Sequence, residues 1–256
     1  MLNFRNMNIL FVILLLLSIG GDVRYGISGY TYLIIWVYSL VLFYGCYYVG
    51  SDFFIRIICS AKTDKKIIAI SFDDGPDEVN SPQILHLLKN NNIQAAFFCI
   101  GNKIAGNEAI LRQAYNGGHL IGNHTFSHHF WFDLFSSKKM TADMQMMNEA
   151  TYKVIGKMPK LFRPPYGVTN PNIKKAIING NYIPVGWSVR SLDTVIKDER
   201  KLLSKLVKKV KPGAVFLFHD TSKTTLAVLP EFLNHVKSSG YEIIRLDKML
   251  NLQAYA

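Results

Sequence analysis

Short apolar runs alternate with amphipathic segments along most of this chain, from residue 65 to its end. The apolar runs predict strands near 67–72, 95–100, 119–122, 160–163, 182–186, 214–218 and 241–246. The segments between them have helical periodicity and predict helices near 82–91, 106–116, 137–156, 171–179, 198–210 and 226–239. Such alternation indicates parallel strands joined by right-handed crossovers. Seven strands favour an α/β fold with a deformed (β/α)7 TIM-like barrel, and an open doubly wound sheet is the alternative.

Cap residues support these helix boundaries. Ser81-Pro82 and Asn170-Pro171 each place a polar cap residue before a proline at the first helical position. Gly117, Gly180 and Gly240 stand where three of the helices are expected to end.

The first 60 residues differ in character from the rest. Residues 6–21 carry no charge, and neither do residues 25–51, which are rich in aliphatic and aromatic side chains. A bilayer core needs roughly 20 apolar residues in a helix, so the second stretch predicts a transmembrane helix. The first stretch predicts either a second span or the apolar region of a signal peptide. No clear small-residue cleavage site follows it, so we expect residues 1–60 to be a retained membrane anchor of one or two helices and residues 61–256 to be one domain.

The charges around the anchor bear on its orientation. Arg5 precedes the first stretch, basic residues from Arg56 to Lys66 follow the second, and Asp22 and Arg24 cancel between them. Positively charged loops stay in the cytoplasm, so for a two-span hairpin the charges predict that both ends are cytoplasmic.

The overall charge and the cysteines exclude some function classes. The formal net charge is +11, but the lysines are scattered and no basic stripe with interleaved aromatic residues appears. We therefore interpret the charge as a solvated surface, with no nucleic-acid partner. The three cysteines do not form a disulfide framework.

Polar residues gather at the ends of the predicted strands. Asp73 and Asp74 end one apolar run, His124 and His128 follow another, and His219 ends a third. Parallel strands of an α/β barrel end on one face, where such enzymes keep their chemistry. Two carboxylates and three histidines gathered there indicate a metal-assisted hydrolase.

The two neighbouring aspartates suit different tasks. Side chains of adjacent strand residues begin on opposite faces, which is a poor start for the paired carboxylates of a glycosidase. It suits one carboxylate on a metal and the other on a proton. Gly75-Pro76 then requires a turn directly after them.

His124 and His128 are four residues apart, so on a helical turn they share a face and can bind one cation. No Glu follows the first of them, which excludes the His-Glu-x-x-His pattern of zincins. A carboxylate from elsewhere would complete a set of two histidines and one carboxylate with positions left for water. We interpret the other four histidines as structural or surface residues: His86, His119, His129 and His235.

Together these residues resemble the motifs of the polysaccharide deacetylase family, the NodB-like carbohydrate esterases, over roughly residues 66–246. The motif Thr/Ser-Phe-Asp-Asp-Gly-Pro stands at Ser71–Pro76, and His-Ser/Thr-x-x-His stands at His124–His128. Arg-x-Pro-Tyr stands at Arg163–Tyr166, and Leu-x-His stands at Leu217–His219. The resemblance implies a NodB homology domain, with its deformed barrel, over residues 61–256.

The resemblance also implies a role for each matching residue. Asp74, His124 and His128 would hold a divalent ion, most often zinc, with cobalt or nickel as substitutes. Asp73 would be the general base that deprotonates the attacking water, and His219 would protonate the departing amine.

Three further positions would support that chemistry. Arg163 would pair with Asp73 and keep it charged. The backbone N–H of Tyr166 would stabilise the oxyanion, and Leu217 would line the pocket for the acetyl methyl group.

The fourth motif of the family departs from its pattern here. Asp-x-x-Asp-Trp is replaced by Arg190-Ser191-Leu192-Asp193-Thr194. Asp193 is kept, and we expect it to brace Arg163. The missing Trp usually helps to wall the active-site groove, and nearby Trp187 is a candidate substitute, although a core position is the plainer expectation.

The sequence thus predicts a metal-dependent hydrolase that removes N-acetyl groups from N-acetylglucosamine units of a polysaccharide such as peptidoglycan, a chitin-like polymer or an exopolysaccharide. The alternatives are an O-acetyl esterase on a glycan such as xylan, and an inactive membrane-tethered glycan-binding protein. An extracellular polymer requires the domain outside the cytoplasmic membrane, against the loop charges. We follow the family resemblance on this point.

Overall fold

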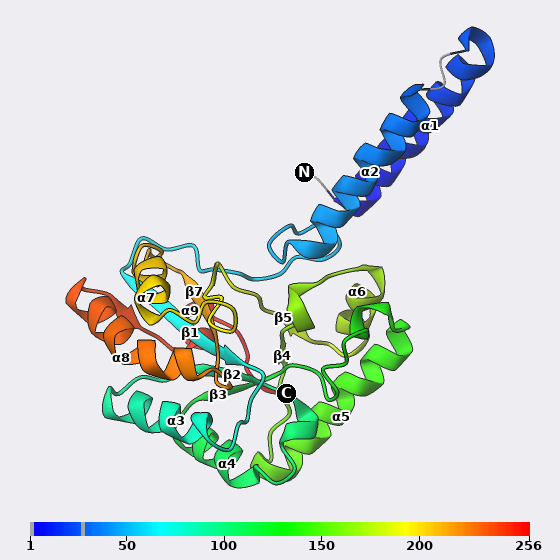
Figure 1. Ribbon diagram of the computed structural model, residues 1–256. Coiled ribbons are helices and arrows are strands. Elements are labelled where there is room, and N and C mark those ends of the chain that lie inside the picture. Colours follow the sequence, from blue (N-terminus) through cyan, green and yellow to red (C-terminus); the bar gives the residue numbers. More distant parts are fainter. Residues whose placement is uncertain (1–2, 27–28) are drawn as a thin grey trace.

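A computed structural model describes residues 3–26 and 29–256. Parallel strands form a curved sheet, helices cover its outer surface, and a long helical hairpin projects from one side (Figure 1). The strands are β1 (Ile67–Asp73), β2 (Ala96–Cys99), β3 (Leu120–Asn123), β4 (Leu161–Phe162), β5 (Ile183–Pro184), β6 (Val189–Arg190), β7 (Val215–His219) and β8 (Glu242–Ile243). The α-helices are α1 (Phe4–Tyr25), α2 (Gly29–Tyr47), α3 (Asn80–Asn90), α4 (Glu108–Asn116), α5 (Ser137–Ile155), α6 (Pro171–Asn179), α7 (Glu199–Val207), α8 (Lys223–Ser238) and α9 (Leu246–Leu250).

The sheet confirms the predicted deformed barrel. Its order is β5-β4-β3-β2-β1-β7-β6, with β8 paired to β1, and every pairing between these strands is parallel. No ladder joins β5 to β6 within the part of the chain that the structure describes. The extended segment after the hairpin lies along this seam, because Ile58 pairs with Val185 and Ser60 pairs with Ala214.

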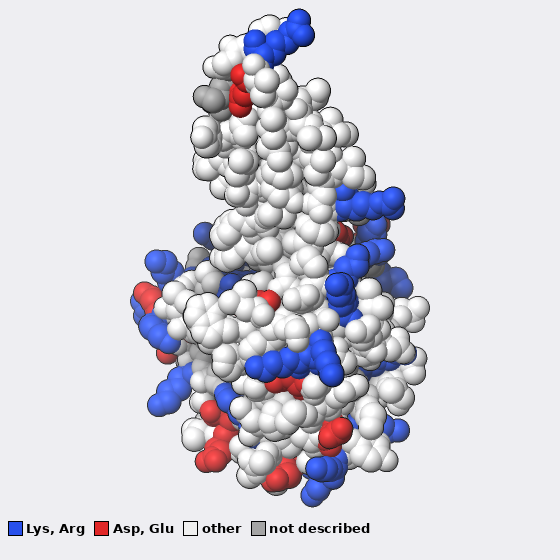
Figure 2. All heavy atoms as spheres, turned by 90° about the vertical axis from the view of Figure 1, so that its right-hand side faces the viewer, with Lys and Arg blue, Asp and Glu red and all other residues white. Residues whose placement is uncertain are grey.

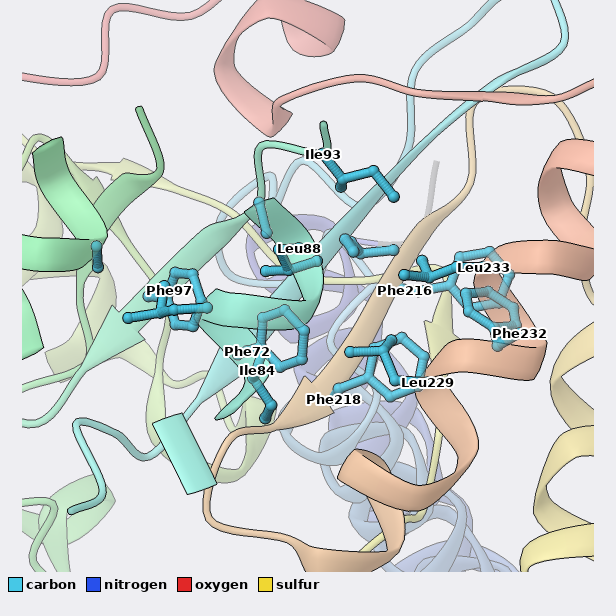
Figure 3. Packing of buried hydrophobic residues seen from close by; sticks show 14 of the residues in the cluster. Phe72, Ile84, Leu88, Ile93, Phe97, Phe216, Phe218, Leu229, Phe232 and Leu233 are labelled. Carbon is cyan, nitrogen blue, oxygen red and sulfur yellow. The ribbon is translucent and has the colours of Figure 1, made fainter. Parts of the chain in front are cut away.

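Apolar side chains of the central strands form the core beneath α3 and α8. Phe72 on β1 stacks on Phe97 of β2 at 5.0 Å between ring centroids, and Phe216 and Phe218 of β7 pack against Phe232 of α8 (Figure 3). Strands buried on both faces read as continuous apolar runs, which is why β1 and β7 were predictable to within a residue or two.

Some boundaries differ from the prediction. The N-terminus of α3 lies two residues before Pro82, because Asp77 Oδ1 accepts hydrogen bonds from the N–H groups of Val79 and Asn80 and takes the capping role expected of Ser81. The segment predicted as strand 241–246 is shorter, because Leu246 begins α9. By contrast, the side chain of Asn170 caps α6 as predicted.

The hairpin of α1 and α2 is apolar and exposed. Its helices have 22 and 19 residues, long enough to cross a bilayer core at about 1.5 Å per residue. Charged side chains lie at its tip and its base, and the surface between is almost free of them (Figure 2). By length and composition, both helices are therefore candidate membrane spans, as predicted.

Both ends of the hairpin meet the domain. The N–H of Phe4 donates to the Phe53 carbonyl at 2.9 Å, and Phe53 and Phe54 are buried. At the end of α2, Thr169 donates its N–H to the Cys46 carbonyl and its hydroxyl to the Gly45 carbonyl, at 3.0 and 3.1 Å. The start of α1 and the end of α2 thus lie on the same side of the hairpin as the barrel.

Candidate active site

The carboxyl ends of four strands bring the predicted residues to one edge of the sheet. Asp73 ends β1 and is in register with His219, which ends β7. His124 follows the last residue of β3, and Arg163 follows the last residue of β4. This convergence is what parallel strands impose, and it joins segments up to 146 positions apart, such as Asp73 and His219.

Asp74, His124 and His128 form a compact donor cluster. Asp74 Oδ1 lies 3.5 Å from His124 Nε2 and 3.4 Å from His128 Nε2, and one ligand atom from each residue lies within 4.8 Å of the others. Asp74 adopts a φ of 74°, and its Oδ1 approaches the same His124 nitrogen as Asp73 Oδ2 does. Its buried Oδ1 has no hydrogen-bond partner. An orphaned carboxylate oxygen facing two imidazole nitrogens fits a divalent cation.

The loop that carries the histidines is not a helical turn, so that expectation was wrong. Thr125 and His128 both have positive φ, 68° and 43°. The loop is held from below by Asp143 of α5, whose Oδ1 accepts hydrogen bonds from the N–H groups of Phe126 and Ser127. Sequence reasoning missed Asp143, because a single polar residue on a helix gives no signal of its tertiary partner.

Hydrogen bonds fix which nitrogen of His124 is free. Its Nδ1 lies 2.8 Å from the Arg163 carbonyl, which can only accept, so Nδ1 carries a proton and the neutral ring would present the Nε2 lone pair toward Asp74. Burial and then His124 lower the pKa of His128 to about 4, which leaves that ring neutral and able to ligate at neutral pH. Burial alone would raise the pKa of Asp74, but His124, His128 and His219 outweigh burial and hold it well below its usual range.

Asp73 is paired with a fully buried arginine. Arg163 Nη1 donates to Asp73 Oδ1 at 2.6 Å and to Ser71 Oγ at 2.9 Å. The carbonyls of Val185 and Gly186 accept the remaining guanidinium hydrogen bonds. Asp73 Oδ2 is left facing His124 Nε2 at 3.8 Å, on the side of the donor cluster.

Asp193 does not brace Arg163, and that expectation was wrong. Its Oδ1 lies 2.7 Å from His219 Nδ1, and its Oδ2 accepts from the His219 N–H at 2.7 Å. The reason is topological: Asp193 follows β6, which pairs with β7, so it lies beside the end of β7, whereas the guanidinium of Arg163 lies over the Phe98 ring of β2 and bonds Asp73 of β1.

The environment of His219 favours its charged form. Burial lowers the pKa of this imidazole, but the hydrogen bond and negative charge of Asp193 outweigh burial and raise it above the ordinary value. The free Nε2 of His219 lies 3.9 Å from Asp74 Oδ2, so a group that can give up a proton faces the cluster of Asp74, His124 and His128. Thr225 of α8 donates a further hydrogen bond to Asp193 and fixes its orientation.

Tyr166 and Leu217 lie on two of the segments that carry the site. Leu217 is buried in β7 two residues before His219. Tyr166 has a φ of 58°, and its ring lies 5.0 Å from that of His128. The following Gly167 has a φ of 74° and lies so close to Trp187 that a Cβ would meet that ring at 2.5 Å. Trp187 therefore packs against this turn and is half-buried, while Thr194 is exposed at the altered motif.

A buried carboxyl beneath the site was also missed. Asp220 is 1 % exposed, Ser81 Oγ donates to its Oδ2 at 2.5 Å, and its Oδ1 has no partner. Burial and, to a smaller extent, the charge of Asp74 raise its pKa to about 7. It follows His219 directly, so only its neighbour in the sequence hinted at it.

Comparison with known proteins adds to this geometry. The family model described as polysaccharide deacetylase matches residues 60–183. A peptidoglycan-N-acetylglucosamine deacetylase of Bacillus cereus is 33% identical over 192 residues, which cover 73% of this chain and 89% of that protein. The peptidoglycan-N-acetylglucosamine deacetylase PgdA of Listeria monocytogenes is 30% identical over 203 residues, 79% of this chain. The match spans 42% of the length of the Listeria protein.

A solved structure has a similar fold. The crystal structure of a peptidoglycan N-acetylglucosamine deacetylase in complex with 4-naphthalen-1-yl-N-oxidanyl-benzamide superposes with a TM-score of 0.74 at 27% identity. The superposition covers 78% of this chain and 95% of that one.

Proposed function

Because this chain belongs to the polysaccharide deacetylase family, we propose that it is a metal-dependent hydrolase that removes N-acetyl groups from N-acetylglucosamine units of a polysaccharide. The cluster of Asp74, His124 and His128, with its orphaned carboxylate oxygen, is the observation that carries the proposal. The names of the relatives support a peptidoglycan-like substrate.

Asp74, His124 and His128 would hold the divalent ion, for which zinc is our expectation and cobalt or nickel the alternatives. When bound, the ion supplies Lewis acidity, which lowers the pKa of water and polarises the acyl oxygen. The carbonyl of Arg163 would keep His124 in the ligating tautomer.

Asp73 would take the proton from the attacking water. Its Oδ1 is engaged by Arg163, so Oδ2 is the atom that acts. The buried guanidinium would hold the carboxylate in one orientation, as a general base requires.

His219 would return a proton to the departing nitrogen. Its Nδ1 is engaged by Asp193, which leaves Nε2 to donate, and its raised pKa favours the protonated form. Tyr166 would offer its backbone N–H to the developing oxyanion, and Leu217 would line the methyl pocket. Asp193 is thus a positioning residue in this proposal, acting through His219.

Residues 1–60 would be a membrane anchor and residues 61–256 the catalytic domain, placed outside the cytoplasmic membrane where acetylated wall or surface polymers lie. The apolar hairpin supports the anchor, and the cell-wall substrates named for the relatives support the location.

Acetate release by the full chain in detergent tests the proposal, with N-acetylglucosamine oligomers and peptidoglycan as substrates and zinc or cobalt added to chelator-treated protein. We expect metal-dependent release that Asp73→Asn abolishes while bound metal is retained. Asp74→Ala should lose both. Release from acetylated xylan instead of these amides would identify an O-acetyl esterase, and normal metal binding without any release would identify a glycan-binding protein.

A further inference from the structure

A loop with three exposed apolar side chains borders the donor cluster. Directly after His128 and His129, the residues from Phe130 to Leu134, here called the mouth loop, expose Phe130 by 66%, Trp131 by 56% and Leu134 by 70%. Phe132 between them is buried in the core and fixes the loop in place. Large apolar side chains held together at a surface mark a site of interaction.

The mouth loop is continuous with the candidate active site. The Phe130 ring lies 4.6 Å from that of Trp131 and 6.4 Å from that of Tyr166, between ring centroids. Tyr166 in turn contacts His128. Whatever covers the mouth loop therefore lies at the entrance to the site.

The same loop lies beside the end of the membrane-anchor helix. Asn170 donates to the Asp133 carbonyl of the mouth loop, and the preceding residue, Thr169, donates to the carbonyls of Gly45 and Cys46 at the end of α2. Three hydrogen bonds thus connect the two segments. The last turns of α2 are themselves aromatic and exposed, at Phe43, Tyr44 and Tyr47.

The composition of this surface matches the interface of a bilayer. Trp and Tyr concentrate at the level of the lipid headgroups, and Leu134 adds an aliphatic side chain that a stacking platform for sugars does not use. Lys138 and Lys139 follow the loop and are exposed, as a surface against anionic lipid requires.

We propose that the mouth loop sits in the bilayer interface beside α2, so that the active site opens at the membrane surface and acts on acetylated glycans attached to membrane lipid. This inference rests on the proposed deacetylase and its membrane anchor. Substrate then arrives by diffusion in the membrane plane, and the anchor sets the height of the site as well as the location of the enzyme.

The three tryptophans of the chain allow a direct test. Trp36 lies in α2, Trp131 lies in the mouth loop, and Trp187 is half-buried in the domain against the turn at Gly167. Three full-length chains, each keeping one of them and carrying Trp→Phe at the other two, would be reconstituted into phosphatidylcholine–phosphatidylglycerol vesicles. Lipids brominated at shallow or deep acyl positions would then quench the fluorescence of each.

We expect deep bromine to quench Trp36, shallow bromine to quench Trp131, and neither to quench Trp187. Trp131 behaving like Trp187 while Trp36 is quenched would overturn this inference alone. An unquenched Trp36 would overturn the anchor and the inference with it. Neither outcome depends on catalysis.

A second measurement addresses the substrate. Acetate release would be compared on soluble N-acetylglucosamine oligomers and on a vesicle phospholipid that carries the same oligomer on its headgroup. Leu134→Asp should lower the rate on the lipid-attached oligomer about tenfold, because a charged side chain cannot replace the burial of the leucine in the bilayer interface. The rate on the soluble oligomer should stay unchanged. Ile178→Asp, an equally exposed position at the far end of α6, should change neither rate.

Trp131→Ala tests the alternative that the mouth loop binds sugars and not lipid. An equal loss on both substrates, with Leu134→Asp silent on both, would make the mouth loop a sugar-stacking platform and overturn the proposal. No release from either substrate, with Trp131 still quenched, would remove the deacetylase function and leave the membrane surface standing.

Discussion

Single residues at this site are distinguished by their partners. Asp73 and Asp193 are both buried aspartates near the same edge of the sheet, yet one pairs with Arg163 and the other with His219. Arg163 engages one oxygen of Asp73 and leaves Oδ2 directed toward the donor cluster. Asp193 engages Nδ1 of His219 and leaves Nε2 directed toward the same cluster. The two opposite proton-transfer roles that we propose for Asp73 and His219 would therefore act within a few ångströms of each other.

Asp193→Asn tests the positioning role at this scale. Removing the negative charge removes the cause that raises the pKa of His219, so the basic limb of the pH profile of kcat/KM should move to lower pH. At pH 8 the rate should fall about 10–100-fold. Thr225→Val, which keeps the Asp193 charge, should leave the limb in place, and an unmoved limb in Asp193→Asn would contradict the role.

Asp220 predicts a pH dependence of stability. Its pKa is raised to about 7 in the folded protein, so the folded state keeps a proton that the unfolded state releases above about pH 4. Stability should therefore fall as pH rises from about 4 to about 7. Asp220→Asn should remove this fall, a gain on the order of 2–4 kcal/mol at pH 8 relative to pH 4. Unfolding curves of the two proteins that keep the same pH dependence would refute this.

Elements of the fold place the site through their ends. The strands contribute almost no catalytic side chain along their length, whereas the residues at or just after their carboxyl ends supply the cluster. Two helices position site residues through hydrogen bonds: Asp143 of α5 holds the histidine loop, and Thr225 of α8 holds Asp193. A helix can thus affect chemistry that it does not contact.

The cap of α6 is testable at the scale of this element. Asn170 Oδ1 accepts from the Ile173 N–H, so Asn170→Ala should cost about 1 kcal/mol of stability and lower the Tm by a few degrees. Asn170→Ser keeps a capping oxygen and should recover most of the loss. Equal Tm values for the alanine variant and the unmodified protein, measured by thermal unfolding in detergent, would exclude the cap as a stabilising contact.

At the scale of the whole molecule, the hairpin of candidate spans would determine how the domain meets a membrane. The Phe4–Phe53 hydrogen bond keeps the start of α1 beside the barrel, so two spans return the chain to the side from which it entered. Arg5 and the basic domain would then lie on the same side of the membrane. The positive charges predict that this side is the cytoplasm, whereas an extracellular substrate requires the outside.

Topology reporters test this arrangement. A reporter at the N-terminal end and one after Ala256 should give the same answer, and both should report the outside of the cytoplasmic membrane. Opposite answers would mean a single span, and loss of an N-terminal tag from the mature protein would mean a cleaved signal peptide. Two cytoplasmic answers would place the domain away from wall polymers.

The sequence alone determined the parts of this protein that depend on local pattern. Continuous apolar runs specified β1 and β7, Asn170-Pro171 specified the start of α6, and uncharged stretches specified the two long helices. The donor residues were recognisable because each follows a strand end in a motif. The two-residue strand β6 and the short helix α9 were not: β6 lies between polar residues, whereas the other two-residue strands lie in apolar runs, and α9 has too few residues to show a helical period.

Only the tertiary structure decided which residues became partners. Asp193 lies beside His219 because β6 pairs with β7, and no spacing along the chain encodes that neighbourhood. The non-helical path of the histidine loop depends on Asp143 from a distant helix, and the contact between α2 and Thr169 depends on how the hairpin meets the barrel. Local sequence sets φ and ψ preferences and amphipathic faces, whereas side-chain pairing depends on the order and curvature of the sheet, which bring Arg163 after β4 to Asp73 at the end of β1.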